Sequence, residues 1–145
     1  MTFDRILTVC LGNICRSPMA EGWLKFTFPS KVVESAGIHG LTNCPADSNA
    51  IEVMKDFGID LSSHRARKLD STLCRSFDLI LVMDQSQKKE IESLFPESKG
   101  KVYLIGHFSH VSSIPDPYQK PFPIFQSCFN LIQSCLDDWK PYLMS

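Results

Sequence analysis

The stretch Cys10-Leu-Gly-Asn-Ile-Cys-Arg16-Ser17 decides the fold of this 145-residue chain. It follows the apolar run Arg5-Ile-Leu-Thr-Val-Cys10 and precedes Pro18-Met-Ala-Glu-Gly-Trp-Leu-Lys-Phe26, in which apolar residues recur at helical spacing. This order predicts a strand, a tight loop and a helix, with Ser17 as the N-cap and Pro18 as the first helical residue.

The same alternation continues along the chain. Short apolar runs predict further strands at 32–36, 77–83 and 102–105, and amphipathic stretches predict helices at 46–57, 85–95 and 124–139. Strands that alternate with helices favour an α/β fold, here one domain over residues 1–145 with a four-stranded parallel sheet and helices on both faces. Ligands of such sheets bind at the carboxyl ends of the strands, so the loop after the first strand is the predicted phosphate-binding loop.

Charge and composition exclude several classes of protein. With 15 Lys and Arg against 16 Asp and Glu, the formal net charge is −1, which gives no basic face for duplex nucleic acid. No run of eighteen apolar residues occurs, so we expect neither a membrane span nor a signal peptide, and a cytoplasmic location. In that reducing compartment the six cysteines are expected to be free thiols.

The chemistry of the loop follows from its residue types. Successive backbone N–H groups at a helix N-terminus form an anion site, and the Arg16 guanidinium offers a planar fork of donors to two phosphate oxygens. Gly12 and Asn13 tolerate the backbone conformations that such a loop needs. The same positive field favours the thiolate of Cys10, which makes it a candidate nucleophile. The alternative interpretation is that Cys10 only ends a buried strand as a small apolar residue.

The sequence resembles the low-molecular-weight protein tyrosine phosphatases. The resemblance rests on Val9 to Pro18 and on Ile114-Pro-Asp-Pro-Tyr118, and extends to 35–37, 64–67 and 77–84. Within that family, 101–108 and 114–120 are most similar to bacterial members associated with capsule or exopolysaccharide export.

The resemblance implies a role for each matching residue. Cys10 attacks phosphorus, Arg16 holds the equatorial oxygens, Asp116 protonates the tyrosyl oxygen and Ser17 donates to the Cys10 thiolate. Phosphate and substrate contacts are implied for Leu11, Gly12, Asn13, Ile14, Cys15, Leu41 and Tyr118. Ser35 and His64 are expected to hold Asn13 in its conformation, and Glu21 to pair with His64.

Two points stay open at this stage. Cys15 either forms a reversible disulfide with Cys10 or only packs under the loop. Leu41 and Gln119 replace aromatic residues of many eukaryotic members, which leaves the peptide preference undetermined. Two other functions also stay open. The spacing of Cys128 and Cys135 fits an arsenate reductase of the same fold, although an apolar helix face explains it more simply. A protein that binds phosphotyrosine without hydrolysing it is the other alternative.

The favoured hypothesis is a monomeric, metal-free and cofactor-free phosphotyrosine hydrolase. Its expected partner is the tyrosine-rich tail of a membrane-bound tyrosine autokinase.

Overall fold

The central sheet has four parallel strands in the order β2-β1-β3-β4. The computed structural model describes residues 2–144, and its strands are β1 (Arg5–Cys10), β2 (Val32–Gly37), β3 (Leu79–Val82) and β4 (Val102–Leu104). β1 lies between β2 and β3, and Cys10 at its carboxyl end is in register with Gly37 of β2. The predicted parallel sheet is confirmed.

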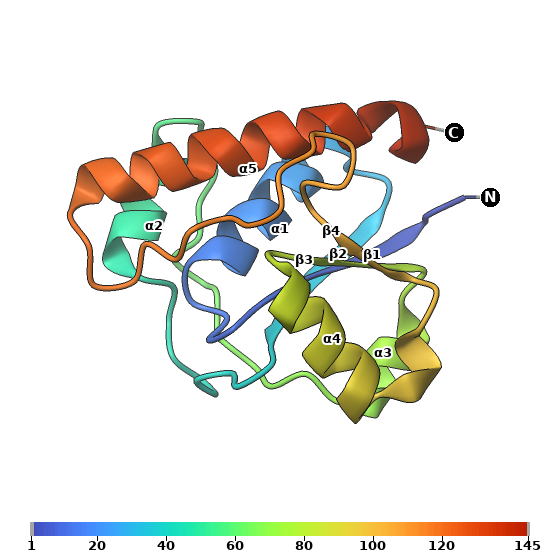
Figure 1. Ribbon diagram of the computed structural model, residues 1–145. Coiled ribbons are helices and arrows are strands. Elements are labelled where there is room, and N and C mark those ends of the chain that lie inside the picture. Colours follow the sequence, from blue (N-terminus) through green and yellow to red (C-terminus); the bar gives the residue numbers. More distant parts are fainter. Residues whose placement is uncertain (1, 145) are drawn as a thin grey trace.

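Helices cover both faces of this sheet (Figure 1). One face carries α1 (Arg16–Thr27), α2 (Ser48–Lys55) and α5 (Phe122–Leu143); the other carries α3 (Ser71–Ser76) and α4 (Gln85–Leu94), with a 3-10 turn η1 (Pro96–Ser98). Successive residues of β1 face opposite sides: Ile6 and Cys10 pack in the core under α1 and α5, whereas Leu7 and Val9 pack in the second core under α3 and α4. The alternation of the strand therefore directs Cys10 toward the face that carries α1 and α5.

The start of α1 differs from its prediction. The helix begins at Arg16 with Cys15 as the N-cap residue and has no side-chain cap, so Ser17 is a helical residue and not the cap. The Ser17 hydroxyl is instead 3.0 Å from Cys10 Sγ and accepts a hydrogen bond from Asn13 Nδ2 at 2.8 Å. The Ser17 side chain, which the sequence predicts as a helix cap, therefore makes its hydrogen bonds within the phosphate-binding loop.

Two more helices differ from the prediction, and the cause is local in each case. Asp47 caps α2 by accepting from Asn49 N, so the helix starts two residues later than predicted, and it ends before Gly58, whose φ is +74°. The sequence reading omitted α3, a helix of only 6 residues capped by Asp70.

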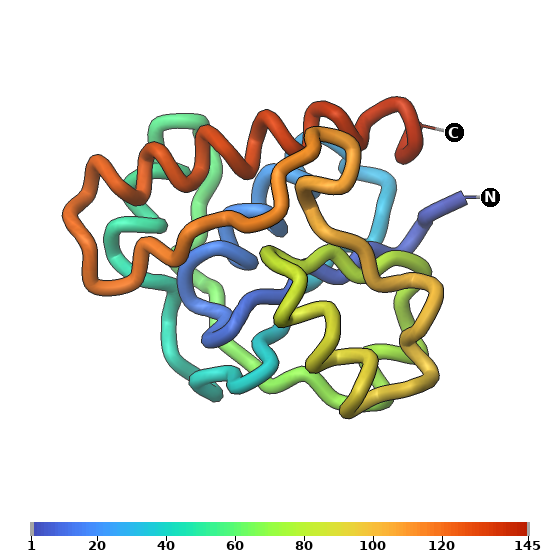
Figure 2. Tube along the Cα trace, in the orientation of Figure 1, coloured from blue at the N-terminus to red at the C-terminus, as the bar shows by residue number. Residues whose placement is uncertain are grey.

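Helix α5 is longer than predicted at both ends. It starts at Phe122, where proline in the first turn costs no hydrogen bond, and it continues past Pro141 to Leu143. Leu143 is buried, so the last turn of the helix packs into the core. The segment 105–121 runs alongside α5 before joining its start (Figure 2), and Trp139 Nε1 fixes it by donating to the Ile105 carbonyl at 2.9 Å.

Candidate active site

Cys10 lies at the end of β1 with its sulfur among hydrogen-bond donors. The residue is 3 % exposed, its Sγ is 3.0 Å from Ser17 Oγ, and Ser17 N donates to it at 3.4 Å. Because the Ser17 oxygen already accepts from Asn13 Nδ2, its proton is free to point at the sulfur. Two donors at the first turn of α1 thus converge on one thiol, an arrangement that stabilises negative charge there.

Arg16 connects this loop to a segment 98 residues further along the chain. Its Nη1 donates to the Ile114 carbonyl at 2.9 Å, and its Nη2 lies 3.5 Å from Asp116 Oδ2. The third guanidinium nitrogen, Nε, is buried and has no hydrogen-bond partner among residues 2–144. A buried unpaired donor is costly, so an anion that accepted from Nε would be favoured.

A cleft of about 200 Å³ opens over these groups. Its polar lining comes from Cys10, Arg16 and Asp116, and its remaining walls are formed chiefly by Leu11, Gly12, Ile14, Cys15, Leu41 and Tyr118. Sequence reasoning missed one lining residue, His39, whose Nε2 lies 3.0 Å from Glu90 Oε2 of α4. An apolar slot above a group of phosphate-binding donors suits an aryl phosphate.

Comparison with known proteins agrees with this geometry. The family model for low molecular weight phosphotyrosine protein phosphatase matches residues 5–144. The chain belongs to this family. It is a protein-tyrosine-phosphatase.

Two curated bacterial relatives and one solved structure are similar over nearly the whole chain. The low molecular weight protein-tyrosine-phosphatase Ptp of Acinetobacter johnsonii is 47 % identical over 143 residues, which is 99 % of this chain and 100 % of that protein. The probable phosphatase EpsP of Ralstonia nicotianae is 47 % identical over 136 residues, 94 % of this chain and 93 % of that one. The tyrosine phosphatase Wzb from Escherichia coli K30, crystallised with sulphate, superposes with a TM-score of 0.94 at 41 % identity, covering 98 % of this chain and 99 % of that one.

The hydrogen bonds that support the phosphate-binding loop from behind are centred on Asn13. Its φ is 61°, in the left-handed region, and it is fully buried. Asn13 Nδ2 donates to Ser35 Oγ at 2.9 Å, and His64 Nε2 is 2.8 Å from the Asn13 carbonyl. The predicted partners Ser35 and His64 therefore lie where the resemblance places them.

Glu21 sits at the centre of the next shell. Its Oε1 accepts from Ser35 Oγ at 2.5 Å and lies 3.9 Å from His64 Nδ1, while its Oε2 pairs with Lys25 at 2.7 Å. The expected contact with His64 is present but longer than the other two. Glu21 thus acts on the loop mainly through Ser35.

Arg67 is a supporting residue that sequence reasoning missed. Its N–H donates to Asn13 Oδ1 at 3.0 Å, its Nε donates to the Ser35 carbonyl at 3.0 Å, and its Nη2 pairs with Glu34. The run Arg65 to Lys68 gave no signal that one of its members faces inward. Backbone hydrogen bonds from Gly37 N to the Arg67 carbonyl and from Leu69 N to the Gly37 carbonyl bring this segment against the sheet.

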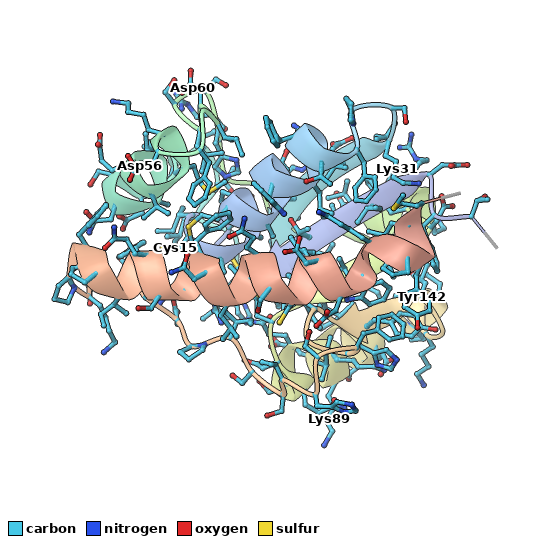
Figure 3. The ribbon with its side chains drawn as sticks, turned by 90° about the horizontal axis from the view of Figure 1, so that it is seen from above. Cys15, Lys31, Asp56, Asp60, Lys89 and Tyr142 are labelled. Carbon is cyan, nitrogen blue, oxygen red and sulfur yellow. The ribbon has the colours of Figure 1, made fainter. Side chains whose placement is uncertain are left out.

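The second cysteine of the loop, Cys15, is buried in the core that also contains the inner face of α5; Figure 3 labels it in the view from above, with α5 in front. Burial is the main cause that raises the pKa of its thiol far above the ordinary value, and Asp47 and Cys10 add to the effect. Its disulfide with Cys10 stays a prediction.

Between residues 2 and 144, His, Cys, Asp and Glu side chains nowhere gather in a group of three that could hold a metal ion. Over the same residues no helix combines the length and apolar character that crossing a membrane requires.

Proposed function

We propose that this phosphatase hydrolyses phosphotyrosine through a phosphocysteine intermediate on Cys10. The observation that carries the proposal is the meeting of the Cys10 thiol, the Arg16 guanidinium and the Asp116 carboxyl in one cleft with apolar walls. The sulphate bound by the related Wzb supports a tetrahedral anion as the ligand of this loop.

In the first step, the Cys10 thiolate attacks phosphorus in line with the tyrosyl oxygen. The S–P bond forms, the P–O bond breaks, and Asp116 in its acid form transfers its proton to the departing phenolate. Arg16 and the backbone amides from Leu11 to Arg16 hold the equatorial oxygens, with Nε of Arg16 gaining the partner that it lacks in the free enzyme. The Arg16–Asp116 contact of 3.5 Å would loosen as the phosphate takes its place.

In the second step, Asp116 as a carboxylate removes a proton from water, and the water oxygen attacks phosphorus. The S–P bond breaks, inorganic phosphate leaves and the Cys10 thiolate is restored. Ser17, whose Oγ is 3.0 Å from the sulfur, donates a hydrogen bond to the leaving thiolate.

The mechanism is tested by rapid quenching during turnover of phosphotyrosine, with mass spectrometry to find the phosphorylated peptide. We expect phosphate on Cys10 in the native protein, no phosphate release by Cys10→Ser, and slow release by Asp116→Asn. Cys44→Ser is the matched control, because Cys44 is an exposed cysteine outside the cleft and its loss should change nothing. Phosphate found on another residue, or turnover retained by Cys10→Ser, would refute the mechanism.

We further propose that the physiological substrate is the tyrosine-rich tail of a membrane-bound tyrosine autokinase that controls exopolysaccharide or capsule production. The protein would act on it as a monomer at the cytoplasmic side of the membrane. Support comes from the resemblance carried by 101–108 and 114–120, and from bacterial relatives along almost the full chain. A phosphotyrosine proteome recorded with and without the protein tests the proposal: kinase-tail peptides should accumulate phosphate in its absence, and unchanged tails would rule that substrate out.

Arsenate reduction is less well supported than hydrolysis. Cys128 and Cys135 lie on the buried face of α5, at 5 % and 0 % exposure, whereas a redox pair must reach the surface to exchange electrons. Thiol consumption in the presence of arsenate measures that activity directly.

A further inference from the structure

The segment that carries Asp116 is tied to the rest of the protein by few hydrogen bonds. We call residues 113–120 the acid loop. Pro115 and Pro117 flank Asp116, and neither has an N–H to donate. Ile114 provides two ties: its N–H donates to the Met83 carbonyl at 2.9 Å, and its carbonyl accepts from Arg16 Nη1 at 2.9 Å.

A third tie comes from α5. The Cys128 thiol donates to the Pro115 carbonyl with an S···O distance of 3.7 Å. That carbonyl belongs to the peptide bond that enters Asp116, so its orientation fixes the backbone from which the acid projects. Beyond Asp116, the Tyr118 N–H returns only to the side chain of Asp116 itself, at 3.1 Å.

The thiol is suited to donate. Cys128 is buried, and this burial raises its pKa to about 12, so the sulfur keeps its proton at neutral pH. Arg16 lowers that pKa, whereas Asp116 and Cys10 raise it, so the thiol lies within electrostatic range of the catalytic groups.

We propose that Cys128 is a positioning residue, which holds the Pro115–Asp116 peptide so that the Asp116 carboxyl points at the leaving-group oxygen. This inference rests on the proposed role of Asp116 as the general acid. It gives a buried cysteine outside the phosphate-binding loop a part in the reaction, and it makes α5 a support of the acid as well as a cover of the sheet.

The test compares two leaving groups. Tyrosine is a poor leaving group that needs the proton from Asp116, whereas 4-nitrophenolate leaves readily without it. Cys128→Val keeps an apolar side chain of similar size but has no donor. We expect kcat/KM for a phosphotyrosine peptide to fall about three- to fivefold, and kcat/KM for 4-nitrophenyl phosphate to fall less than about twofold. Cys128→Ser, which restores a donor, should recover most of the loss.

Cys135→Ala is the matched control, because Cys135 is buried on the same helix 7 residues further on and, within residues 2–144, its thiol makes no hydrogen bond to the acid loop. Its thermal stability should fall while the ratio of the two kcat/KM values stays that of the native protein. A native ratio in Cys128→Val, or an equal loss in Cys128→Val and Cys128→Ser, overturns the inference.

Asp116→Asn distinguishes a failure of the proposed acid role of Asp116 from a failure of the proposed role of Cys128. It should lose far more activity on phosphotyrosine than on 4-nitrophenyl phosphate. If it loses both equally, the acid role itself fails and the inference fails with it. If it discriminates while Cys128→Val does not, only the role of Cys128 is wrong.

Discussion

The phosphate-binding loop and the acid loop line the same cleft but are built differently. In the phosphate-binding loop, residues 10–16, Cys10, Asn13 and Arg16 are at most 4 % exposed. In the acid loop the Asp116 side chain is 44 % exposed and Tyr118 is 47 % exposed. The groups of the phosphate-binding loop that carry its chemistry therefore lie in the core, although its rim residue Leu11 is 44 % exposed, and the acid loop lies over them at the surface. We call the two loops the buried half and the exposed half of the cleft.

The difference follows from what each half has to do. Donors that stabilise a transition state act best when they are fixed before the substrate arrives, and Asn13 alone provides contacts to Ser17, Ser35 and Arg67 that fix the loop. The acid loop has to leave room beside Asp116 for the tyrosine side chain in the first step and for a water molecule in the second. A loop tied to the body of the protein by few hydrogen bonds and by the Arg16–Asp116 ion pair can make that adjustment, and we expect substitutions in the two halves to have different consequences.

Arg16→Lys is expected to have the largest effect, because Arg16 is part of the phosphate-binding loop and also contacts the acid loop. Lysine keeps the charge but loses the planar fork and the bond from Nη1 to the Ile114 carbonyl. We expect kcat/KM for phosphotyrosine to fall about 10³-fold. Arg65→Lys is the control, since the Arg65 side chain is exposed and donates only to the neighbouring His64 carbonyl. Comparable losses in the two variants would contradict a special role for Arg16.

Substitutions of Asn13 test the buried half alone. Asn13→Ala loses the side-chain hydrogen bonds and also places a Cβ-bearing residue without local hydrogen bonding at a φ of 61°, whereas Asn13→Gly loses only the bonds. Both variants should lose activity about 10- to 100-fold. By urea unfolding, Asn13→Ala should be less stable than Asn13→Gly by about 1 kcal/mol, and equal stabilities would show that the left-handed backbone carries no cost.

Tyr118→Ala tests the exposed half. Loss of the aromatic wall should raise KM for a phosphotyrosine peptide about five- to tenfold with little change in kcat, because the ring contributes binding and not chemistry. Tyr118→Phe keeps the ring and should match the native protein. A fall of kcat in Tyr118→Phe would instead give the hydroxyl a chemical role.

The smallest effect is expected in alkaline unfolding. Burial raises the pKa of Cys74 to about 11 and that of Cys128 to about 12, from an ordinary value of 9.0. A folded-state pKa above the unfolded value stabilises the fold fully below pH 9, and this contribution is lost as the pH rises through the folded-state pKa. The free energy of unfolding should therefore decline above pH 9, and less steeply in Cys74→Ala and in Cys128→Val than in the native protein. Identical slopes in all three would contradict the assignment.

Much of the buried half was predictable from the sequence. A strand that ends in Cys10, a short loop and an arginine at a helix start follow one another within 7 residues, so their proximity is a local property of the chain. The left-handed residue was also within reach, because Asn13 is of a type that adopts this conformation. Ser17 was misassigned as an N-cap because a cap and a thiolate donor look alike in sequence, and only the position of the Cys10 sulfur separates them.

The exposed half was predictable only through the family resemblance. Asp116 is 100 residues beyond Arg16 in the chain, and the sequence has no periodicity that brings the two together. Arg67 and His39 show the same limit. Each looks ordinary in sequence, and each owes its place at the site to a contact with a residue far away in the chain. Cys128 drew attention only for its spacing with Cys135, which did not point to its contact with Pro115.

The amino-acid sequence by itself determined the order of strands and helices, the parallel sheet and the anion-binding loop at its centre, because these depend on hydrophobic periodicity and on residues close together in the chain. Only the tertiary structure decided which carboxyl group faces the thiol, which side chains hold the strained asparagine and which cysteine lies behind the acid. The carboxyl group and the cysteine come into place when α5 and the segment before it pack against the sheet, and Asn13 is held when β2 and the segment 64–67 pack beside the loop. Packing between distant segments is a property of the whole chain.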